Sequence, residues 1–352
     1  MSMFCYQCEQ TSQATGCTSF GVCGKDPETA ALQDLLVEVC KKISEKAHAK
    51  RQAGETTREA DLYVMEGLFT TVTNVNFDPK DIAGIISRGF QLATEMGVEC
   101  DKELPKDLDA MISLGEEIGI ESRLNTLGPD VTGLQELIIY GLKGTAAYAD
   151  HAFVLEKEDD SVFAFFHEAM AFLLNPAPTV DELVGYALKT GEVNLTVMAL
   201  LDAANTGTYG PPVPTPVNIS AVKGKAILVS GHDLKDLELL LKQTEGKGIN
   251  IYTHGEMLPC HGYPELKKYP HLVGNYGGAW QDQRSEFEAF PGAILMTTNC
   301  IQKPKENYKA RIFTGGLVQW PGVEHIDNGD YTPVIEAALA AEGFAETEEE
   351  KT

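Results

Sequence analysis

Apolar residues recur every three or four positions along most of the first half of the chain, a spacing typical of amphipathic helices. The first such helix follows Asp26-Pro27-Glu28, which supplies an N-cap, a proline for the first helical position and an acidic first turn. Its apolar stripe consists of Leu32, Leu35, Leu36, Val39 and Ile43. Further helical patterns cover approximately residues 58–75, 79–96, 105–119, 130–155, 159–174, 180–191 and 192–205. Strand signals are nearly absent before residue 215, so this part is expected to be helical.

Two short motifs of the helical part return further along the chain. Leu32-Gln33-Asp34-Leu35-Leu36 is echoed by Leu134-Gln135-Glu136-Leu137-Ile138, and Asp81-Ile82-Ala83-Gly84-Ile85 is echoed by Asp181-Glu182-Leu183-Val184-Gly185. Each echo lies about a hundred residues downstream, which is the size of a small helical bundle. We therefore expect two duplicated helical bundles packed together. The alternative is coincidence, because amphipathic helices resemble one another in composition.

The pattern changes after Gly210-Pro211-Pro212-Val213-Pro214-Thr215-Pro216, a stiff proline-rich stretch that cannot continue a helix. Beyond it, short apolar runs alternate with helical or loop segments. This alternation predicts a Rossmann-like parallel sheet, in which ligands bind outside the carboxyl ends of the strands. The expected strands lie at residues 226–229, 249–252, 293–296 and 311–313.

The expected fold class is multidomain, α followed by α/β. Residues 1–215 would hold a cysteine-rich loop and the two helical bundles, and residues 216–352 a Rossmann-like α/β domain with an acidic C-terminal tail. In the second part, Thr332-Pro333 opens a final helix that reaches about residue 342, and the charge run at 346–352 is typical of a solvated tail. A length of 352 residues fits two or three domains of roughly 150 residues each.

The chain is strongly acidic, with 52 acidic and 28 basic residues and a formal net charge of −24. Such a surface repels phosphate backbones and anionic lipids, so neither nucleic acid nor a membrane is expected as a partner. No run of about 18 apolar residues is present and the N-terminus shows no export signal, so we expect a cytoplasmic protein. In that compartment, clustered cysteines indicate metal or redox chemistry rather than disulfides.

Four of the eight cysteines, Cys5, Cys8, Cys17 and Cys23, lie within nineteen residues in the pattern C-x2-C-x8-C-x5-C. Four thiolates on one loop can surround a single metal centre. The alternative is a zinc site, but zinc sites are usually built from two close cysteine pairs, and only Cys5 and Cys8 are close in sequence. Glycines beside the later cysteines, at positions 16, 21 and 24, suit the close approach of backbone amides to cluster sulfides. The spacing therefore favours an iron–sulfur cluster.

Three further candidate metal ligands stand at the ends of three expected strands: His232, Glu256 and Cys300. A lone histidine or cysteine is usually a structural residue, but strand ends of a parallel sheet converge on one crevice. A mixed set of nitrogen, oxygen and sulfur donors suits a redox-active iron centre with open positions. Of the nearby residues His254, Cys260 and His261, Cys260 is expected to be a wall residue rather than a ligand, because Pro259 and the following loop lead it away from the strand end.

Motifs in both parts of the chain resemble those of one known family. In the loop they are Phe4-Cys5-Tyr6-Gln7-Cys8-Glu9-Gln10-Thr11, Gly16-Cys17 and Gly21-Val22-Cys23-Gly24-Lys25. In the α/β part they are Ser230-Gly231-His232-Asp233-Leu234-Lys235-Asp236, Thr253-His254-Gly255-Glu256-Met257-Leu258-Pro259, Gly274-Asn275-Tyr276-Gly277-Gly278 and Thr297-Thr298-Asn299-Cys300. Together they resemble the hybrid-cluster (prismane) protein family, also called hydroxylamine reductases, along nearly the whole chain.

The resemblance implies two centres. Cys5, Cys8, Cys17 and Cys23 match the ligands of a cubane [4Fe–4S] cluster, and His232, Glu256 and Cys300 match three ligands of a hybrid [4Fe–2O–2S] cluster. The implied reaction is the two-electron reduction of hydroxylamine to ammonia and water, and nitric oxide reduction has also been assigned to the family. The cubane would relay electrons from a redox protein donor to the hybrid cluster, where hydroxylamine is the small-molecule substrate.

One departure from the family affects the second centre. Family members continue through a second α/β domain that carries three more cysteines and another glutamate of the hybrid cluster, but no cysteine follows Cys300 here. The chain thus matches the N-terminal two-thirds of the family and is expected to carry an incomplete set of hybrid-cluster ligands. The alternative function is a one-cluster electron carrier or an inactive fragment.

Overall fold

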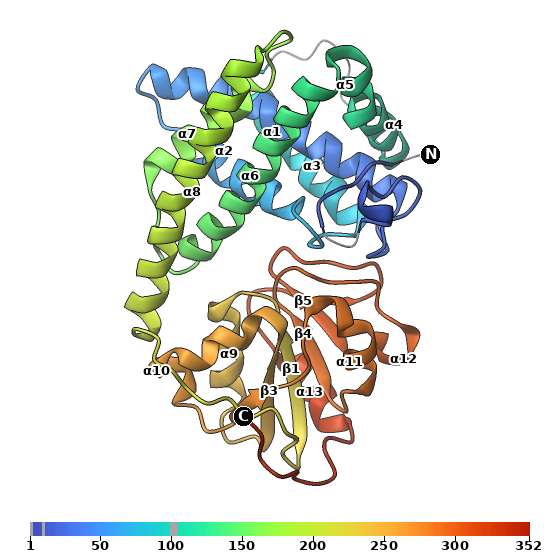
Figure 1. Cartoon of the computed structure of the whole chain (residues 1–352), viewed down its shortest axis with the longest axis vertical. Coiled ribbons are helices and arrows are strands. Elements are labelled where there is room, and N and C mark those ends of the chain that lie inside the picture. The colour runs from blue at the N-terminus through green and yellow to red at the C-terminus, as the bar shows by residue number, and fades with distance from the viewer. Residues whose placement is uncertain (1–2, 9–10, 99–104) are drawn as a thin grey trace. The chain divides into compact units, whose positions relative to one another are not determined.

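The computed structural model describes residues 3–8, 11–98 and 105–352, and it divides into two compact units, Met1–Leu201 and Asp202–Thr352. Helices form the first unit after a short turn of 3₁₀ helix, and Figure 1 labels them in chain order. They are η1 (Ser12–Ala14), α1 (Pro27–Gln52), α2 (Arg58–Thr70), α3 (Pro79–Glu95), α4 (Leu108–Ile118), α5 (Ile120–Leu127), α6 (Pro129–Phe153), α7 (Asp160–Phe172) and α8 (Val180–Tyr209), within which the division falls.

Aspartates and prolines fix where several of these helices begin. Asp26 accepts a hydrogen bond from the Thr29 N–H at 2.8 Å, and Asp78 accepts one from the Lys80 N–H at 2.9 Å. Pro27 then occupies the first helical position of α1, where a missing N–H costs nothing. These caps satisfy amide groups that a first helical turn leaves without partners. The N-cap and the N1 proline expected at Asp26-Pro27 are both present.

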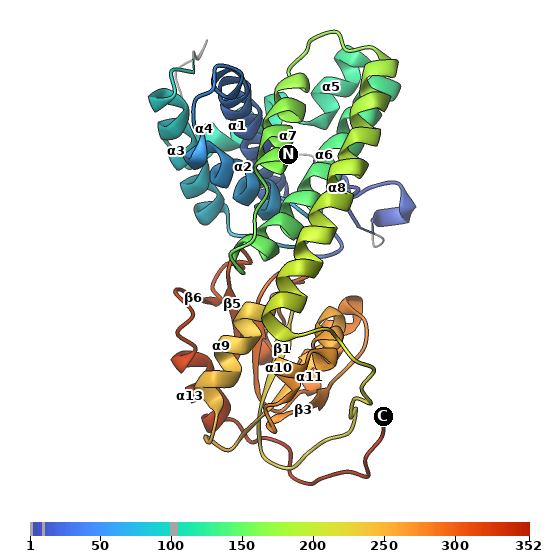
Figure 2. The same cartoon turned by 90° about the vertical axis from the view of Figure 1, so that its left-hand side faces the viewer.

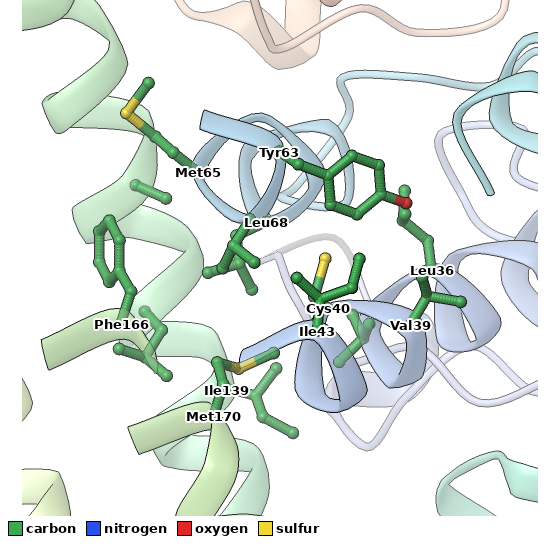
Figure 3. Packing of buried hydrophobic residues seen from close by; sticks show 14 of the residues in the cluster. Leu36, Val39, Cys40, Ile43, Tyr63, Met65, Leu68, Ile139, Phe166 and Met170 are labelled. Carbon is green, nitrogen blue, oxygen red and sulfur yellow. The ribbon is translucent and has the colours of Figure 1, made fainter. Parts of the chain in front are cut away.

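Helix α1 is at the centre of the first unit and packs against α2, α3, α4 and α7. Figure 3 shows its buried residues Leu36, Val39, Cys40 and Ile43 among side chains from neighbouring helices. Gly67 of α2 lies so close to Cys40 that a Cβ atom there would come within 2.7 Å of the thiol sulfur. Burial raises the pKa of Cys40 to about 12, so this thiol stays protonated and serves packing.

A buried carboxylate joins three helices of this core. Asp61 of α2 accepts a hydrogen bond from Arg51 of α1 at 2.7 Å and one from Thr57 at 2.8 Å, and it lies 2.8 Å from Nε2 of His167 on α7. Burial raises the pKa of Asp61, but the bonds from His167, Thr57 and Arg51 outweigh burial and hold the pKa below its usual value. Asp61 is therefore ionised near neutral pH, and the bonds from its partners offset the cost of burying its charge.

The helical pattern differs from the prediction in two places. The expected helices at 180–191 and 192–205 are one continuous helix, α8, as Figure 2 shows. Gly191, near the expected break, is open to its surroundings and stays helical, since a single glycine weakens a helix without ending it. The second difference is α5, a short helix that starts directly after Gly119 and that the sequence pattern did not indicate.

The second unit is built on a six-stranded parallel sheet with the strand order β3-β2-β1-β4-β5-β6. This is the order of doubly wound dinucleotide-binding folds, and it reverses between β1 and β4. Helix α13 packs against β1 and β4. The elements are β1 (Lys225–Ser230), α9 (Leu234–Thr244), β2 (Ile249–His254), η2 (Gly255–Gly262), α10 (Pro264–Lys267), β3 (Leu272–Asn275), η3 (Trp280–Asp282), α11 (Gln283–Ala289), β4 (Ala293–Met296), α12 (Glu306–Lys309), β5 (Ile312–Gly315), β6 (Glu324–Ile326) and α13 (Thr332–Ala340).

All four expected strands are present as β1, β2, β4 and β5, whereas β3 and β6 were missed. The acidic tail also differs in part from the expectation. Its side chains are exposed, but its backbone pairs with the segment before β1: Ile219 donates to the Lys351 carbonyl at 2.7 Å and Glu348 donates to the Ala221 carbonyl at 2.9 Å. Charged side chains do not prevent a chain from using its backbone groups at the edge of a fold.

The expected fold class, α followed by α/β, is confirmed. The compact units meet at residue 201, whereas the proline-rich stretch that suggested the boundary lies after α8, so the domain limits 1–215 and 216–352 stay a prediction. In the part of the chain that the structure describes, no helix combines the length and the apolar character needed to cross a membrane.

Replacing Asp61 with asparagine is expected to destabilise the helical unit by about 3 kcal/mol, because Arg51 loses a buried counter-charge. The effect is measured by urea unfolding followed by circular dichroism. Because the pKa of Asp61 is depressed in the folded state, its contribution is present above the unfolded carboxyl pKa and is lost as the pH falls below about 4. The matched control is Asp160→Asn, which removes the other carboxylate of Arg51, at 2.9 Å but 82% exposed. An equal loss in both variants would contradict the special role of the buried contact.

Candidate functional site

The cysteine loop brings Cys5 and Cys17 together directly. The two residues form an antiparallel bridge, in which the Cys5 N–H donates to the Cys17 carbonyl at 3.0 Å and the Cys17 N–H donates to the Cys5 carbonyl at 2.8 Å. Gly16 makes this pairing possible, because its φ of +144° is unfavourable for a side chain and a Cβ atom would come within 2.7 Å of the Phe4 ring. Two of the four predicted ligands are thus held by the backbone itself.

Cys23 lies close enough to Cys5 and Cys8 to interact with them electrostatically. Burial raises the pKa of the Cys23 thiol, the charge and backbone N–H of Lys25 lower it, and negative charge on Cys5 or Cys8 raises it again. The turn around Cys23 is tight, with the Gly24 N–H bonded to the Gly21 carbonyl at 2.9 Å. A buried thiol of this kind releases its proton when a metal replaces it.

Hydrogen bonds at Tyr6 and Gln7 attach the loop to the helical unit. The Gln7 carbonyl accepts hydrogen bonds from Thr73 at 2.7 Å and from Tyr140 of α6 at 3.0 Å. Tyr6 donates to a carboxylate oxygen of Glu136, also on α6, at 2.9 Å. These contacts fix the segment between Cys5 and Cys8 and so limit where the two thiols can lie.

In the α/β unit, the ends of β1 and β4 approach each other closely at Gly231. Its φ is +121°, and a Cβ atom there would lie 2.4 Å from Oγ1 of Thr297 and 2.7 Å from the Thr298 backbone nitrogen. Only glycine fits this position. The close approach falls where the strand order reverses, which is the usual ligand crevice of such a sheet.

His232 follows Gly231 and connects the ends of three strands. Its backbone N–H donates to Oγ1 of Thr298 at 2.8 Å, and its Nδ1 lies 3.0 Å from the same oxygen. Its Nε2 lies 2.7 Å from Oε2 of Glu256, which follows β2. The hydrogen bond from His232 lowers the pKa of Glu256 against the opposing effect of burial, so the carboxylate is ionised. Two of the three predicted strand-end ligands therefore point at one place.

Cys300 lies on the loop after β4, two residues beyond the Thr298 that contacts His232. Its sulfur is 3.5 Å from Nδ2 of Asn299, and its carbonyl accepts a hydrogen bond from Gln283 at 2.6 Å. Within residues 3–8, 11–98 and 105–352, no three histidine, cysteine, aspartate or glutamate side chains are grouped closely enough to hold one metal ion. The three predicted ligands therefore all follow carboxyl ends of neighbouring strands, and two of them, His232 and Glu256, are in contact.

A second layer of polar groups supports this edge. His254, at the end of β2, is fully buried between Oγ of Ser230 at 3.0 Å and Oε2 of Glu286 at 2.8 Å. Glu286 also accepts from the Gly278 N–H at 2.8 Å. Such partners hold the backbone beside a site in place. Cys260 is fully buried in η2, and burial raises its pKa, as is expected of a wall residue.

The donor chemistry of both places fits iron–sulfur groups. Four cysteines on one anchored loop match the thiolate ligation of a cluster, and a cluster of several irons spans more space than a single ion. His232, Glu256 and Cys300 offer nitrogen, oxygen and sulfur at a strand edge, and the adjacent imidazole and carboxylate suit neighbouring positions on one iron.

Sequence reasoning missed two residues that the structure places beside these sites. Thr298 orients His232, and its signal was the polar Thr297-Thr298-Asn299 run directly after a buried strand. Lys143 is buried in α6, next to the cysteine loop, with a side chain oriented toward Gln7. Its signal was a lysine in an otherwise apolar helical stripe, formed with Ile139, Leu142 and Ala146.

The family is shown by comparison with known proteins. Residues 3–351 match the model of the Prismane/CO dehydrogenase family, so the chain belongs to that family, and this membership implies iron–sulfur clusters. Two curated relatives named hydroxylamine reductase, from Methanocella arvoryzae and Syntrophobacter fumaroxidans, are each 52% identical to 98% of this chain. The chain covers 66% of the length of each of these relatives.

Among solved structures, carbon monoxide dehydrogenase IV from Carboxydothermus hydrogenoformans aligns with 96% of this chain and 53% of its own. The identity is 16% and the TM-score is 0.37, a likeness too low to support a structural argument.

Gly231→Ala is expected to destabilise the α/β unit by about 3 kcal/mol or more, because strain at positive φ adds to the clash with Thr297 and Thr298. Gly246→Ala is the matched control, since Gly246 has a φ of +71° but no neighbour within 4 Å, so only strain of about 1 kcal/mol remains. Urea unfolding of the two variants compares them. Equal losses would show that the β1 and β4 loops do not meet as closely as described.

Proposed function

We propose that the whole protein is an iron–sulfur oxidoreductase that reduces hydroxylamine with two electrons and two protons, releasing ammonia and water. The main support is the 52% identity to proteins named hydroxylamine reductase along 98% of this chain. The proposal is also supported by the anchored loop that carries the four cysteines and by the contact between His232 and Glu256 at the strand ends. A redox protein is the proposed electron donor.

In this proposal, Cys5, Cys8, Cys17 and Cys23 hold a [4Fe–4S] cluster, and His232, Glu256 and Cys300 hold part of a hybrid [4Fe–2O–2S] cluster. When bound, the two clusters would supply electron storage and an open iron position. The chain's own residues position the ligands: the backbone pairing of Cys5 with Cys17 holds two of the cysteines together, and Thr298 orients the His232 ring. With Nδ1 of His232 facing Thr298, Nε2 is left to bind iron beside the Glu256 carboxylate.

The helical unit is proposed to be an internal duplication, as the sequence motifs indicated. Each of three consecutive helices has a counterpart that starts about a hundred residues later: α1 and α6, α2 and α7, α3 and α8. The first pair has 26 and 25 residues, and both members of the second pair have 13. The constant offset supports duplication more strongly than the short motifs alone.

Iron and acid-labile sulfide analysis tests the cysteine site on this chain. We expect about four irons and four sulfides to be bound at the N-terminal loop, and Cys17→Ser to lose most of them. Cys40→Ala is the matched control, because Cys40 is a buried packing residue of the same unit, and it should keep full iron content. Bound zinc without sulfide would contradict the proposal, while about eight irons would show that the second cluster also assembles.

Glu256→Gln tests the strand-end site in the complete protein. The change preserves size but removes the negative oxygen donor, so hydroxylamine reduction should fall at least a hundredfold while the spectrum of the N-terminal cluster is unchanged. Glu265→Gln, at an exposed position of α10, serves as the control and should retain activity. Retained activity in Glu256→Gln would refute the assignment of Glu256.

A further inference from the structure

A small cavity lies beside Cys5 in the helical unit. It has a volume of about 30 Å³ and is lined by the cysteine loop and by residues of α1, α4, α5 and α6. One water needs roughly 10–15 Å³ by the same measure, so the cavity has room for very few waters. The side chains of Lys25 and Lys143 are buried, so bulk solvent hardly hydrates these two lysines. Buried charged side chains here must therefore be neutralised by one another rather than by water.

The lining carries more positive than negative charge. Its basic side chains are Lys25, Lys41, Arg123 and Lys143, and its carboxylates are Asp34, Glu38 and Glu136. Two pairs cancel: Lys41 lies 3.2 Å from Glu38, and Arg123 forms an ion pair with Glu136. Among the described residues that line the cavity, two lysines then remain against the carboxylate of Asp34.

Both remaining lysines are bonded to neutral groups and directed toward the cysteine loop. Lys25, 3% exposed, donates to the Gln33 side-chain oxygen at 2.6 Å and lies 4.0 Å from the Cys5 sulfur. Lys143, 5% exposed, donates to the Thr71 carbonyl at 3.2 Å. In one orientation of the Gln7 side-chain amide, both its nitrogen and its oxygen have partners. The nitrogen then donates to the Thr71 carbonyl at 3.3 Å, and Lys143 donates to the oxygen at 3.2 Å. Gln7 stands between the ligands Cys5 and Cys8.

A surplus ammonium group is costly in such a place unless a further negative charge is present. Burial lowers the pKa of Lys143 to about 8, although Glu136 and Asp34 oppose this effect. A cluster held by four thiolates is anionic, and it gains one more negative charge on reduction. A nearby buried cation therefore favours the reduced form, because the interior screens charges weakly.

We infer that Lys143, with Lys25, is the buried counter-charge of the cluster and raises its reduction potential. The inference rests on the proposed function, since it needs an iron–sulfur cluster at Cys5, Cys8, Cys17 and Cys23. Lys143 acts through the field at the cluster and through Gln7, and it is not itself a ligand.

The experiment is a redox titration of the full chain at mediator-buffered potentials, followed by electron paramagnetic resonance, with iron and sulfide counted in each sample. Lys143→Gln keeps a hydrogen-bond donor and removes the charge, and Lys143→Met removes both. At a fixed potential near the wild-type midpoint, each should lower the ratio of reduced to oxidised cluster about tenfold, equivalent to 59 mV for one electron. Lys42→Met removes the same charge from an exposed position of α1 and should leave the ratio within about twofold.

The outcomes separate the inference from the proposed function. An unchanged ratio in Lys143→Gln at full cluster content overturns the inference alone, and a wild-type chain without iron and sulfide overturns both.

Discussion

The close approach of the β1 and β4 loops is the constraint on which the strand-end site depends. Gly231 leaves no room for a side chain between the two loops, so Thr298 comes within hydrogen-bond distance of both the backbone and the ring of His232. The ring then points at Glu256, which follows β2, the neighbour of β1 on the side opposite β4. Without that approach, Thr298 would not reach the His232 ring, and the orientation of the ring toward Glu256 would lose this support.

Buried charge is managed differently in the two parts of the helical unit. At Asp61 the charge is compensated within the chain, because Arg51, Thr57 and His167 all bond to one carboxylate. Beside Cys5, the described residues that line the cavity leave one positive charge without a matching carboxylate. The proposed cluster, which is anionic, would supply the missing negative charge beside Cys5.

Local pattern was enough to predict most of the elements, and the exceptions have physical causes. Helices α1 to α4, α6 and α7 follow strong apolar periodicity, and four strands follow buried apolar runs. Strand β3 is short and contains glycine, and β6, Glu324-His325-Ile326, is polar; both lie at sheet edges, where pairing depends on a neighbour rather than on propensity. The continuity of α8 was missed because one glycine does not end a helix that is otherwise well formed.

By itself, the sequence determined which donor atoms are available and that four thiols lie on one short loop, since residues so close along a chain cannot be far apart in space. It also placed His232, Glu256 and Cys300 at strand ends, because alternating strands and helices indicate a parallel sheet. Only the tertiary structure decided which of these side chains touch. The His232–Glu256 contact depends on the β1–β2 register, and the position of Lys143 beside Gln7 depends on how α6 packs against the loop. Register and packing are set by many distant residues together, so no local pattern contains them.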